Sequence, residues 1–191
     1  MPKLGMAPIR RQQLIAATIA VIAEQGFSNI TVAHISRAAG VSAGIIHHYF
    51  GGKNELLEAA MRSILQDLRA RTTERLAGKS DPRERLRAII DANFAGSQFS
   101  AMAVRAWLAF WSQAPYVPAL DRLQRVNAAG LRSNLCHVLK QLLPEAEARR
   151  AATTLAVLID GLSLRSALEG GVPDAETARA LVLSHAERLL T

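Results

Sequence analysis

Hydrophobic residues recur at helical spacing along almost the whole chain. Apolar side chains three and four residues apart, interrupted by Gly, Pro and small polar residues, are typical of amphipathic helices. No segment shows the sustained alternation, bounded by turn residues, that predicts a strand. The pattern therefore predicts an all-α fold of roughly nine helices. They are expected as one helix that ends at Gly26, two short helices between Thr31 and Phe50, a long helix from about Lys53 to Gly78, and later helices near 82–95, 101–113, 118–142, 145–169 and 174–190.

The two short helices form the most informative segment, TVAHISRAAGVSAGIIHHYFGGKNELL, at residues 31–57. Thr31 and Ser42 suit the N-caps of the first and second helix. In the second helix, Ile46 and Phe50 lie four residues apart and are expected to point inward. Its opposite face is small or polar, with Ala43, Gly44, His47 and His48. This pattern predicts a helix-turn-helix, whose second helix enters the DNA major groove.

Composition supports a nucleic-acid partner only weakly. The formal net charge of +7 and the pI of about 10.5 favour polyanions, although an ordinary basic surface explains them equally well. Cys136 is the single cysteine, which excludes a disulfide within one chain and is better explained as a buried structural thiol than as a nucleophile. Because neither a membrane-spanning run nor a signal peptide is apparent, we expect a soluble cytoplasmic protein, associated with the nucleoid when bound to DNA.

Residues 9–57 closely resemble the DNA-binding head of the TetR family of bacterial repressors, through the first helix ending in EQGF and the segment described above. The stretches KLGM, IRRQQLI, GIIHHYF and AMAVRAWLAFW further resemble the choline-responsive repressors of this family, which control the conversion of choline to the osmoprotectant glycine betaine. The resemblance implies a helix-turn-helix DNA-binding domain at 1–52 and a ligand-binding and dimerisation domain at 53–191. It also implies a homodimer on a pseudo-palindromic double-stranded operator, with choline as inducer, no cofactor and no membrane partner.

The DNA contacts expected from this resemblance divide into two kinds. Phosphate contacts are expected from Thr31, Tyr49 and Lys53, and less firmly from Arg37, Arg10 and Arg11. The groove should be approached by Ser42, Ala43 and Gly44 and read by His47 and His48. Capping alone would fully explain Thr31 and Ser42. A metal site at the two histidines is disfavoured because neighbouring helical side chains diverge by about 100°.

Aromatic residues, scarce elsewhere, gather before and within the segment 101–113. Trp107 and Trp111 lie four apart, with Phe110 beside them and Phe94 and Phe99 upstream. Spacing alone favours an ordinary aromatic core, by roughly two to one. The resemblance favours a cage, in which aromatic faces hold a quaternary ammonium by cation–π attraction.

A carboxylate would complete such a cage. Asp160 occupies the middle of an apolar helix and must have a partner, which could be Arg165, backbone donors, the second subunit or a ligand cation. A structural role for Asp160 is equally compatible with the sequence. Asn93 and Tyr116 are weaker candidates for binding the choline hydroxyl or closing the cage.

The last two helices are expected to form the dimer interface, with one apolar face at Ala178, Leu181, Val182, His185 and Leu189 and another at Leu155, Leu158, Ile159 and Leu162.

Three alternatives to the choline-responsive repressor remain open. The nearest is a TetR-type regulator of another pathway that senses a lipophilic cation. A helical-bundle enzyme would need a convergent acid, base or metal set that the sequence does not offer. An architectural DNA-binding protein would have no effector.

Overall fold

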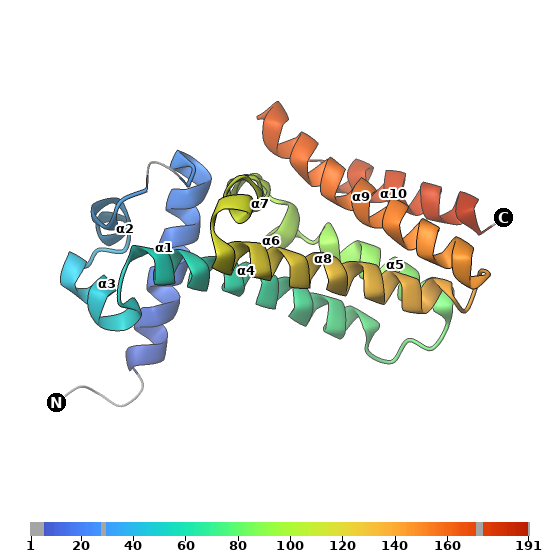
Figure 1. Cartoon of the computed structure of the whole chain (residues 1–191), viewed down its shortest axis with the longest axis horizontal. Coiled ribbons are helices and arrows are strands. Elements are labelled where there is room, and N and C mark those ends of the chain that lie inside the picture. The colour runs from blue at the N-terminus through green and yellow to red at the C-terminus, as the bar shows by residue number, and fades with distance from the viewer. Residues whose placement is uncertain (1–5, 28–29, 171–173, 191) are drawn as a thin grey trace.

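The computed structural model describes residues 6–27, 30–170 and 174–190, and within these ranges the chain contains helices and no strand (Figure 1). The all-α prediction is confirmed. The three N-terminal helices form a head at one end of an elongated molecule, and the long α4 runs from the head into the bundle. The elements are α1 (Met6–Gln25), α2 (Val32–Ala38), α3 (Ala43–Phe50), α4 (Lys53–Leu76), α5 (Pro82–Asn93), α6 (Gly96–Phe99), α7 (Ala101–Gln113), the 3₁₀ turn η1 (Ala114–Tyr116), α8 (Pro118–Leu139), α9 (Glu145–Glu169) and α10 (Ala175–Leu189).

Local signals set most helix ends where the sequence predicts them. The Thr31 hydroxyl accepts a hydrogen bond from the amide of His34 at 3.2 Å, and Asp81 and Ser100 cap α5 and α7 in the same way. Gly40 has a φ of +63°, which permits the tight turn between α2 and α3. The four-residue α6 was not predicted, because so short a helix has no hydrophobic period. Of the motifs that carry the resemblance, residues 3–5 of KLGM lie outside the described residues.

Two clusters of buried hydrophobic residues fill the molecule, and the boundary between them differs from the predicted domain boundary. The first cluster combines the head with α4 and with the aromatic helix α7, including Leu14, Ile46 and the fully buried Phe110. The second joins α5, α8, α9 and α10 and includes Phe94 and Phe99. Helix α1 packs against both α4 and α7. The hydrophobic core therefore continues across residue 52 and joins α4 and α7 to the head.

Helix α9 is the one helix in the described ranges that is long and apolar enough to cross a membrane by length and composition. In the structure it packs against α7, α8 and α10. The two apolar faces predicted for the dimer interface are instead largely occupied within the chain: Leu155, Ile159, Ala178 and Val182 are all buried. The interface prediction was wrong for these residues, because periodicity shows that a helix has an apolar side but not which neighbour covers it.

Candidate functional site

The helix-turn-helix presents a polar outer surface on a firmly packed inner one. Ile46 is fully buried and Phe50 is 8% exposed, so α3 is anchored through these two side chains. Its other face, together with the start of α2, is open. The exposed predicted contacts are Thr31, Arg37, Ser42, Ala43, Gly44, His47 and His48, while Tyr49 and Lys53 are half-buried. We call this set of nine residues the recognition face.

The hydroxyls at the two helix starts differ in their bonding. Thr31 caps α2 as described, and its O–H can still donate to another group. Ser42 occupies the N-cap position of α3, but its side chain makes no capping hydrogen bond. Capping therefore does not account for Ser42, whose hydroxyl is left available at a helix N-terminus.

The two histidines of α3 have different environments. His47 Nδ1 lies 3.2 Å from the carbonyl oxygen of Gly51, the residue that caps the C-terminal end of α3. Because a carbonyl only accepts, Nδ1 must carry the proton there, and Nε2 of a neutral ring is then an acceptor. The ring of His48 packs edge-on against Tyr49, with centroids 5.0 Å apart. Both rings are thus held in place near the C-terminal end of α3.

Lys53 and Arg11 were both expected to contact phosphate, and the structure separates them. Lys53 is the first residue of α4, and no described residue forms an ion pair with its ammonium group. Arg11 donates a hydrogen bond to the carbonyl oxygen of Tyr49, and its guanidinium lies 4.3 Å from the ring centroid of Phe50. Arg11 thereby fastens α1 to the end of α3, and it is not a free arm residue.

A small inner cavity of about 20 Å³ lies where α4, α5, α6, α7, α8 and α9 meet. It is lined by Leu68, Asn93, Gln98, Trp107, Trp111, Asn127, Leu131, Ile159, Asp160 and Ser163. The sequence predicted Trp107, Trp111, Asp160 and Asn93 here and missed the other six, whose side chains are aliphatic, amide or hydroxyl groups with no distinctive pattern. A space of this size holds about one water molecule.

The two indoles are in direct contact, with centroids 5.6 Å apart and planes inclined by 33°. Trp107 is 5% exposed and donates from Nε1 to Oε1 of Gln98 at 3.3 Å, whereas Trp111 is only half-buried. Two predicted cage residues lie elsewhere. Phe110 points into the head-side core and does not line the cavity, and Tyr116, in the turn after α7, is 80% exposed.

Asp160 is the only ionisable side chain among the described residues that line the inner cavity. Burial raises the pKa of its carboxyl from 3.8 to about 6, because desolvation disfavours the charged form. Arg165, a partner considered above, instead lies 3.8 Å from Glu169. No hydrogen bond or ion pair to Asp160 occurs in the described part of the chain. The cavity thus contains a desolvated carboxyl group beside two indoles.

A larger groove of about 610 Å³ adjoins the inner cavity, between α4, α5 and α8. The two spaces share Leu68, Asn93, Asn127 and Leu131. The groove is lined mainly by leucines, amides and threonines, with Arg62 and Arg69 among them. Displacing the shared side chains would join the two spaces, so the groove is a possible route from solvent to Asp160.

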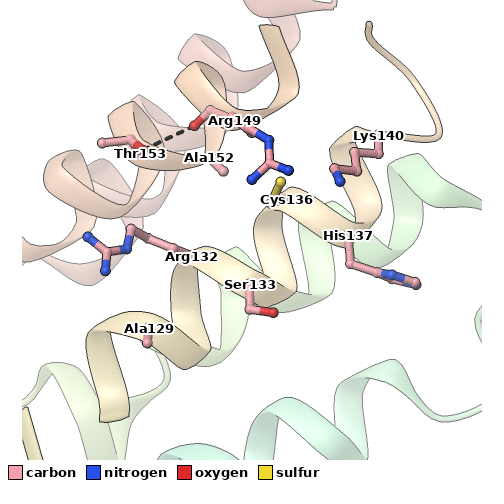
Figure 2. A pocket seen from close by; sticks show the side chains of 9 residues that line it. All are labelled: Ala129, Arg132, Ser133, Cys136, His137, Lys140, Arg149, Ala152 and Thr153. Carbon is pink, nitrogen blue, oxygen red and sulfur yellow. Dashed lines mark hydrogen bonds between the residues drawn. The ribbon is translucent and has the colours of Figure 1, made fainter. Parts of the chain in front are cut away.

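A third space, of about 530 Å³, lies between α8 and α9 (Figure 2). Its lining includes Arg132, Lys140 and Arg149 around Cys136. Lys140 and Arg149 both contact Glu145, at 2.8 and 2.6 Å, so two of the three cations are already paired. Figure 2 shows the His137 ring directed away from Cys136. Groups of three or more metal-ligating side chains do not occur in the described ranges.

Comparison with known proteins identifies the architecture. Residues 14–60 match the family described as bacterial regulatory proteins, tetR family, and residues 82–191 match the BetI-type transcriptional repressor C-terminal family. The chain belongs to the TetR family. The regulator BetI 1 of Chromohalobacter salexigens is 53% identical over 191 residues, covering 100% of this chain and 95% of its own. The regulator BetI of Burkholderia mallei is 52% identical over 191 residues, covering 100% of this chain and 98% of its own.

Solved structures of TetR-type regulators have the same fold. One from Haloarcula marismortui superposes with a TM-score of 0.84 at 25% identity, covering 96% of this chain and 100% of its own. A transcriptional regulator from Saccharomonospora viridis was solved in complex with choline. It superposes with a TM-score of 0.80 at 22% identity, covering 94% of this chain and 96% of its own. This TetR-family chain is therefore a DNA-binding transcriptional repressor with a BetI-type C-terminal region, and it is not an enzyme.

Proposed function

We propose that this protein is a homodimeric repressor of genes for converting choline to glycine betaine, and that choline, bound at the inner cavity, is its inducer. The observation that carries the choline assignment is the cavity lining, in which the one ionisable group among the described residues is an unpaired carboxyl flanked by two indoles. A permanent cation that cannot donate a hydrogen bond from its charged end is suited to that combination. The choline complex of the S. viridis regulator supports the assignment.

On the DNA side, the recognition face supplies the contacts. Thr31, Arg37, Tyr49 and Lys53 bind phosphates, with the Thr31 and Lys53 positions aided by the positive ends of α2 and α4. The small first turn of α3, at residues 42–44, lets the backbone approach the groove. His47 and His48 meet base edges, and the Nε2 acceptor of His47 suits an exocyclic amine of adenine or cytosine.

Choline binding requires the inner cavity to open. Its seven heavy atoms exceed a space that holds about one water. The indoles are in contact, so the trimethylammonium group binds against their outer faces or after one of them turns. The hydroxyl of choline can donate to Oδ1 of Asn93, whose Nδ2 already donates to the carbonyl of Ile89 at 2.9 Å. Entry through the adjoining groove displaces the side chains of Leu68 on α4 and Leu131 on α8, which line both spaces.

A second copy of this chain covers the open side of α9 and α10. Four apolar side chains on this side are between 39% and 67% exposed: Val157, Leu164 and Leu168 on α9 and Leu181 on α10. This exposure is unusual for α9, which is apolar enough to cross a membrane by length and composition. Gly161 lies in the same stripe, and a side chain added there would meet nothing within 4 Å, so its outer surface is open to close approach by another helix. Two copies joined through these helices form a four-helix bundle and give a two-fold dimer that reads a pseudo-palindrome.

The division of labour follows from this arrangement. Residues 1–52 form the DNA-binding unit and residues 53–191 the ligand-binding and dimerisation unit, with α4 common to both. Because cytoplasmic DNA is the target, the protein acts in the cytoplasm.

A second candidate effector is a larger lipophilic cation. The observation in its favour is the groove of about 610 Å³, whose leucine-rich lining extends beyond the needs of a ligand as small as choline. Such a compound would occupy the groove and the inner cavity together.

A choline titration of intrinsic tryptophan fluorescence tests the proposal, because Trp107 and Trp111 are the only tryptophans. We expect a saturable change with choline and none with glycine betaine, whose carboxylate would face Asp160. Trp111→Ala should weaken choline binding about 30-fold, since a desolvated cation–π contact contributes about 2 kcal/mol, while Trp111→Phe retains much of it. A response to ethidium alone would favour the second candidate, and no response to either would remove both.

A further inference from the structure

Gln98 is a buried amide that joins the inner cavity to α4. It belongs to the short α6, lines the cavity and is 3% exposed. Its Oε1 accepts the hydrogen bond from Nε1 of Trp107 at 3.3 Å, and its Nε2 donates to Oδ2 of Asp67 at 2.8 Å. A longer contact of 3.4 Å leads from the same Nε2 to the carbonyl oxygen of Ile64. Both ends of the amide are therefore used, one on α7 and the other on α4.

The chemistry of the two partners fixes the orientation of this amide. An indole nitrogen can only donate, and an ionised carboxylate can only accept. The oxygen of Gln98 must therefore face Trp107 and its nitrogen must face Asp67. A side chain that links these two groups has to offer both an acceptor and a donor, which methionine does not and an ionised glutamate does not.

Asp67 makes the α4 end of the link firm. Its Oδ2 also accepts from the hydroxyl of Ser97 at 2.7 Å and from Nε of Arg71 at 3.0 Å. Burial by itself would raise the pKa of Asp67, but the hydrogen bonds from Ser97, Gln98 and Arg71 outweigh burial and lower it. The carboxylate is thus charged at neutral pH, and two consecutive residues of α6 are fastened to it.

We propose that Gln98 is a positioning residue that converts displacement of Trp107 into displacement of α4 around Ile64 and Asp67. A ligand too large for the inner cavity must move its lining, and Trp107 is part of that lining. Movement of the indole pulls on the hydrogen bond between Trp107 and Oε1 of Gln98. The amide nitrogen of Gln98 is bonded to Asp67 on α4, the helix that starts at Lys53 in the head. This inference rests on the proposed function and adds the route by which the occupied cavity is communicated to the DNA-binding unit.

The alternative is that Gln98 only satisfies the buried indole N–H. Replacing it would then lower stability but leave the effect of choline on DNA binding unchanged. The two roles are separated by the coupling factor, which is the ratio of operator dissociation constants with and without saturating choline.

The experiment compares the parent protein with Gln98→Met, Gln98→Glu, Asp67→Asn and the double variant Gln98→Glu/Asp67→Asn at pH 8. Circular dichroism establishes folding, and tryptophan fluorescence gives the choline affinity of each. We expect a parent coupling factor of at least about 5 and a factor below about 2 in Gln98→Met and Gln98→Glu, with both still binding choline. The double variant should recover coupling, because Nδ2 of the introduced asparagine can donate to the introduced glutamate carboxylate, which still accepts from Trp107.

Each other outcome is decisive. Parent-like coupling in Gln98→Met, or no recovery in the double variant, would overturn the role of Gln98 while leaving the proposed function intact. If Gln98→Met does not fold, Gln98→Glu and its recovery by Asp67→Asn decide the matter. A parent protein that binds no choline, or whose operator affinity choline leaves unchanged, would overturn the proposed function and the relay with it.

Discussion

The recognition face and the inner cavity differ in how much each must change before it can bind the partner proposed for it. On α3, the outward side chains already project from a helix anchored by Ile46 and Phe50. At the inner cavity, Trp107 and Trp111 contact each other and leave about 20 Å³. A helix entering the major groove needs little rearrangement, whereas a seven-heavy-atom ligand needs the packing of several helices to change.

This difference has an energetic consequence for a switch. If only a small fraction of molecules has an open cavity, the apparent affinity for ligand equals the intrinsic affinity multiplied by that fraction. Ligand then shifts the equilibrium only by its preference for the open form. Under the proposed function, an outward-facing recognition face and a closed inner cavity predict that the ligand-free protein is the form that binds DNA.

The largest predicted effect concerns the proposed dimer, in which one recognition face would read only half of a pseudo-palindrome. Val157→Glu places a charge in the apolar stripe of α9, and we expect monomers in analytical ultracentrifugation and at least about 100-fold weaker operator binding. Val126→Glu is the matched control, because Val126 on α8 is 67% exposed, nearly the same as Val157 at 65%. A Val157→Glu protein that remains dimeric would place the interface on another surface.

The second prediction concerns the closed cavity and its pH dependence. The charge of choline does not change with pH, so a pH-dependent affinity reports on the protein alone. With the pKa of Asp160 at about 6, choline affinity should fall as the pH is lowered from 8 to 5, because protonation removes the negative charge. Each unit by which bound choline lowers that pKa corresponds to tenfold in affinity, or about 1.4 kcal/mol. Asp160→Asn should bind about tenfold more weakly at pH 8, with no pH dependence.

Stability gives an independent check on the same group without ligand. The raised pKa of Asp160 means that the folded state holds its proton up to about pH 6, whereas the unfolded chain releases it near 3.8. Parental stability should therefore decline as pH rises through this window. Asp160→Asn should be more stable than the parent at pH 8, on the order of 3 kcal/mol in urea unfolding, and equal below pH 3.8. Asp121→Asn serves as control, at a carboxylate on α8 that is 43% exposed and pairs with Arg125 at 3.2 Å; an equal gain there would contradict the argument.

The same contrast explains what could be predicted from the sequence. The helix-turn-helix was foreseen because its signals are local: an N-cap at Thr31, a left-handed glycine at 40 and an inward pair at Ile46 and Phe50. The inner cavity draws one to three residues from each of six helices, and most of them, such as Leu131, are ordinary in their own segment. Of the lining residues, the sequence indicated the two tryptophans, Asp160 and, as a weaker candidate, Asn93.

The errors have physical causes of the same kind. Phe110 and Trp107 lie three residues apart on α7, yet Phe110 packs into the core shared with α1 while Trp107 reaches Gln98. Helical spacing places residues on a face but does not say which neighbouring helix covers it. Tyr116 follows the end of α7, so its direction no longer obeys the helical period. Gln98 gave no signal, because a glutamine in a loop-like stretch is usually exposed.

The smallest predicted effects concern Lys53 on the recognition face and Arg11 behind it. Lys53 is proposed to bind phosphate, and Arg11 holds α1 against the end of α3. We expect Lys53→Ala and Arg11→Met each to weaken operator binding several-fold, the first by removing a phosphate contact and the second by loosening α1 from the end of α3. Only the first should change the dependence of log K on log salt, by about 0.9 per lost contact and so about 1.8 for a dimer. Binding assays between roughly 50 and 200 mM salt measure both slopes. A flatter slope in Arg11→Met would mean that the guanidinium leaves Tyr49 and Phe50 to bind DNA, so that even this face rearranges on binding and the contrast with the cavity is weaker than the structure indicates.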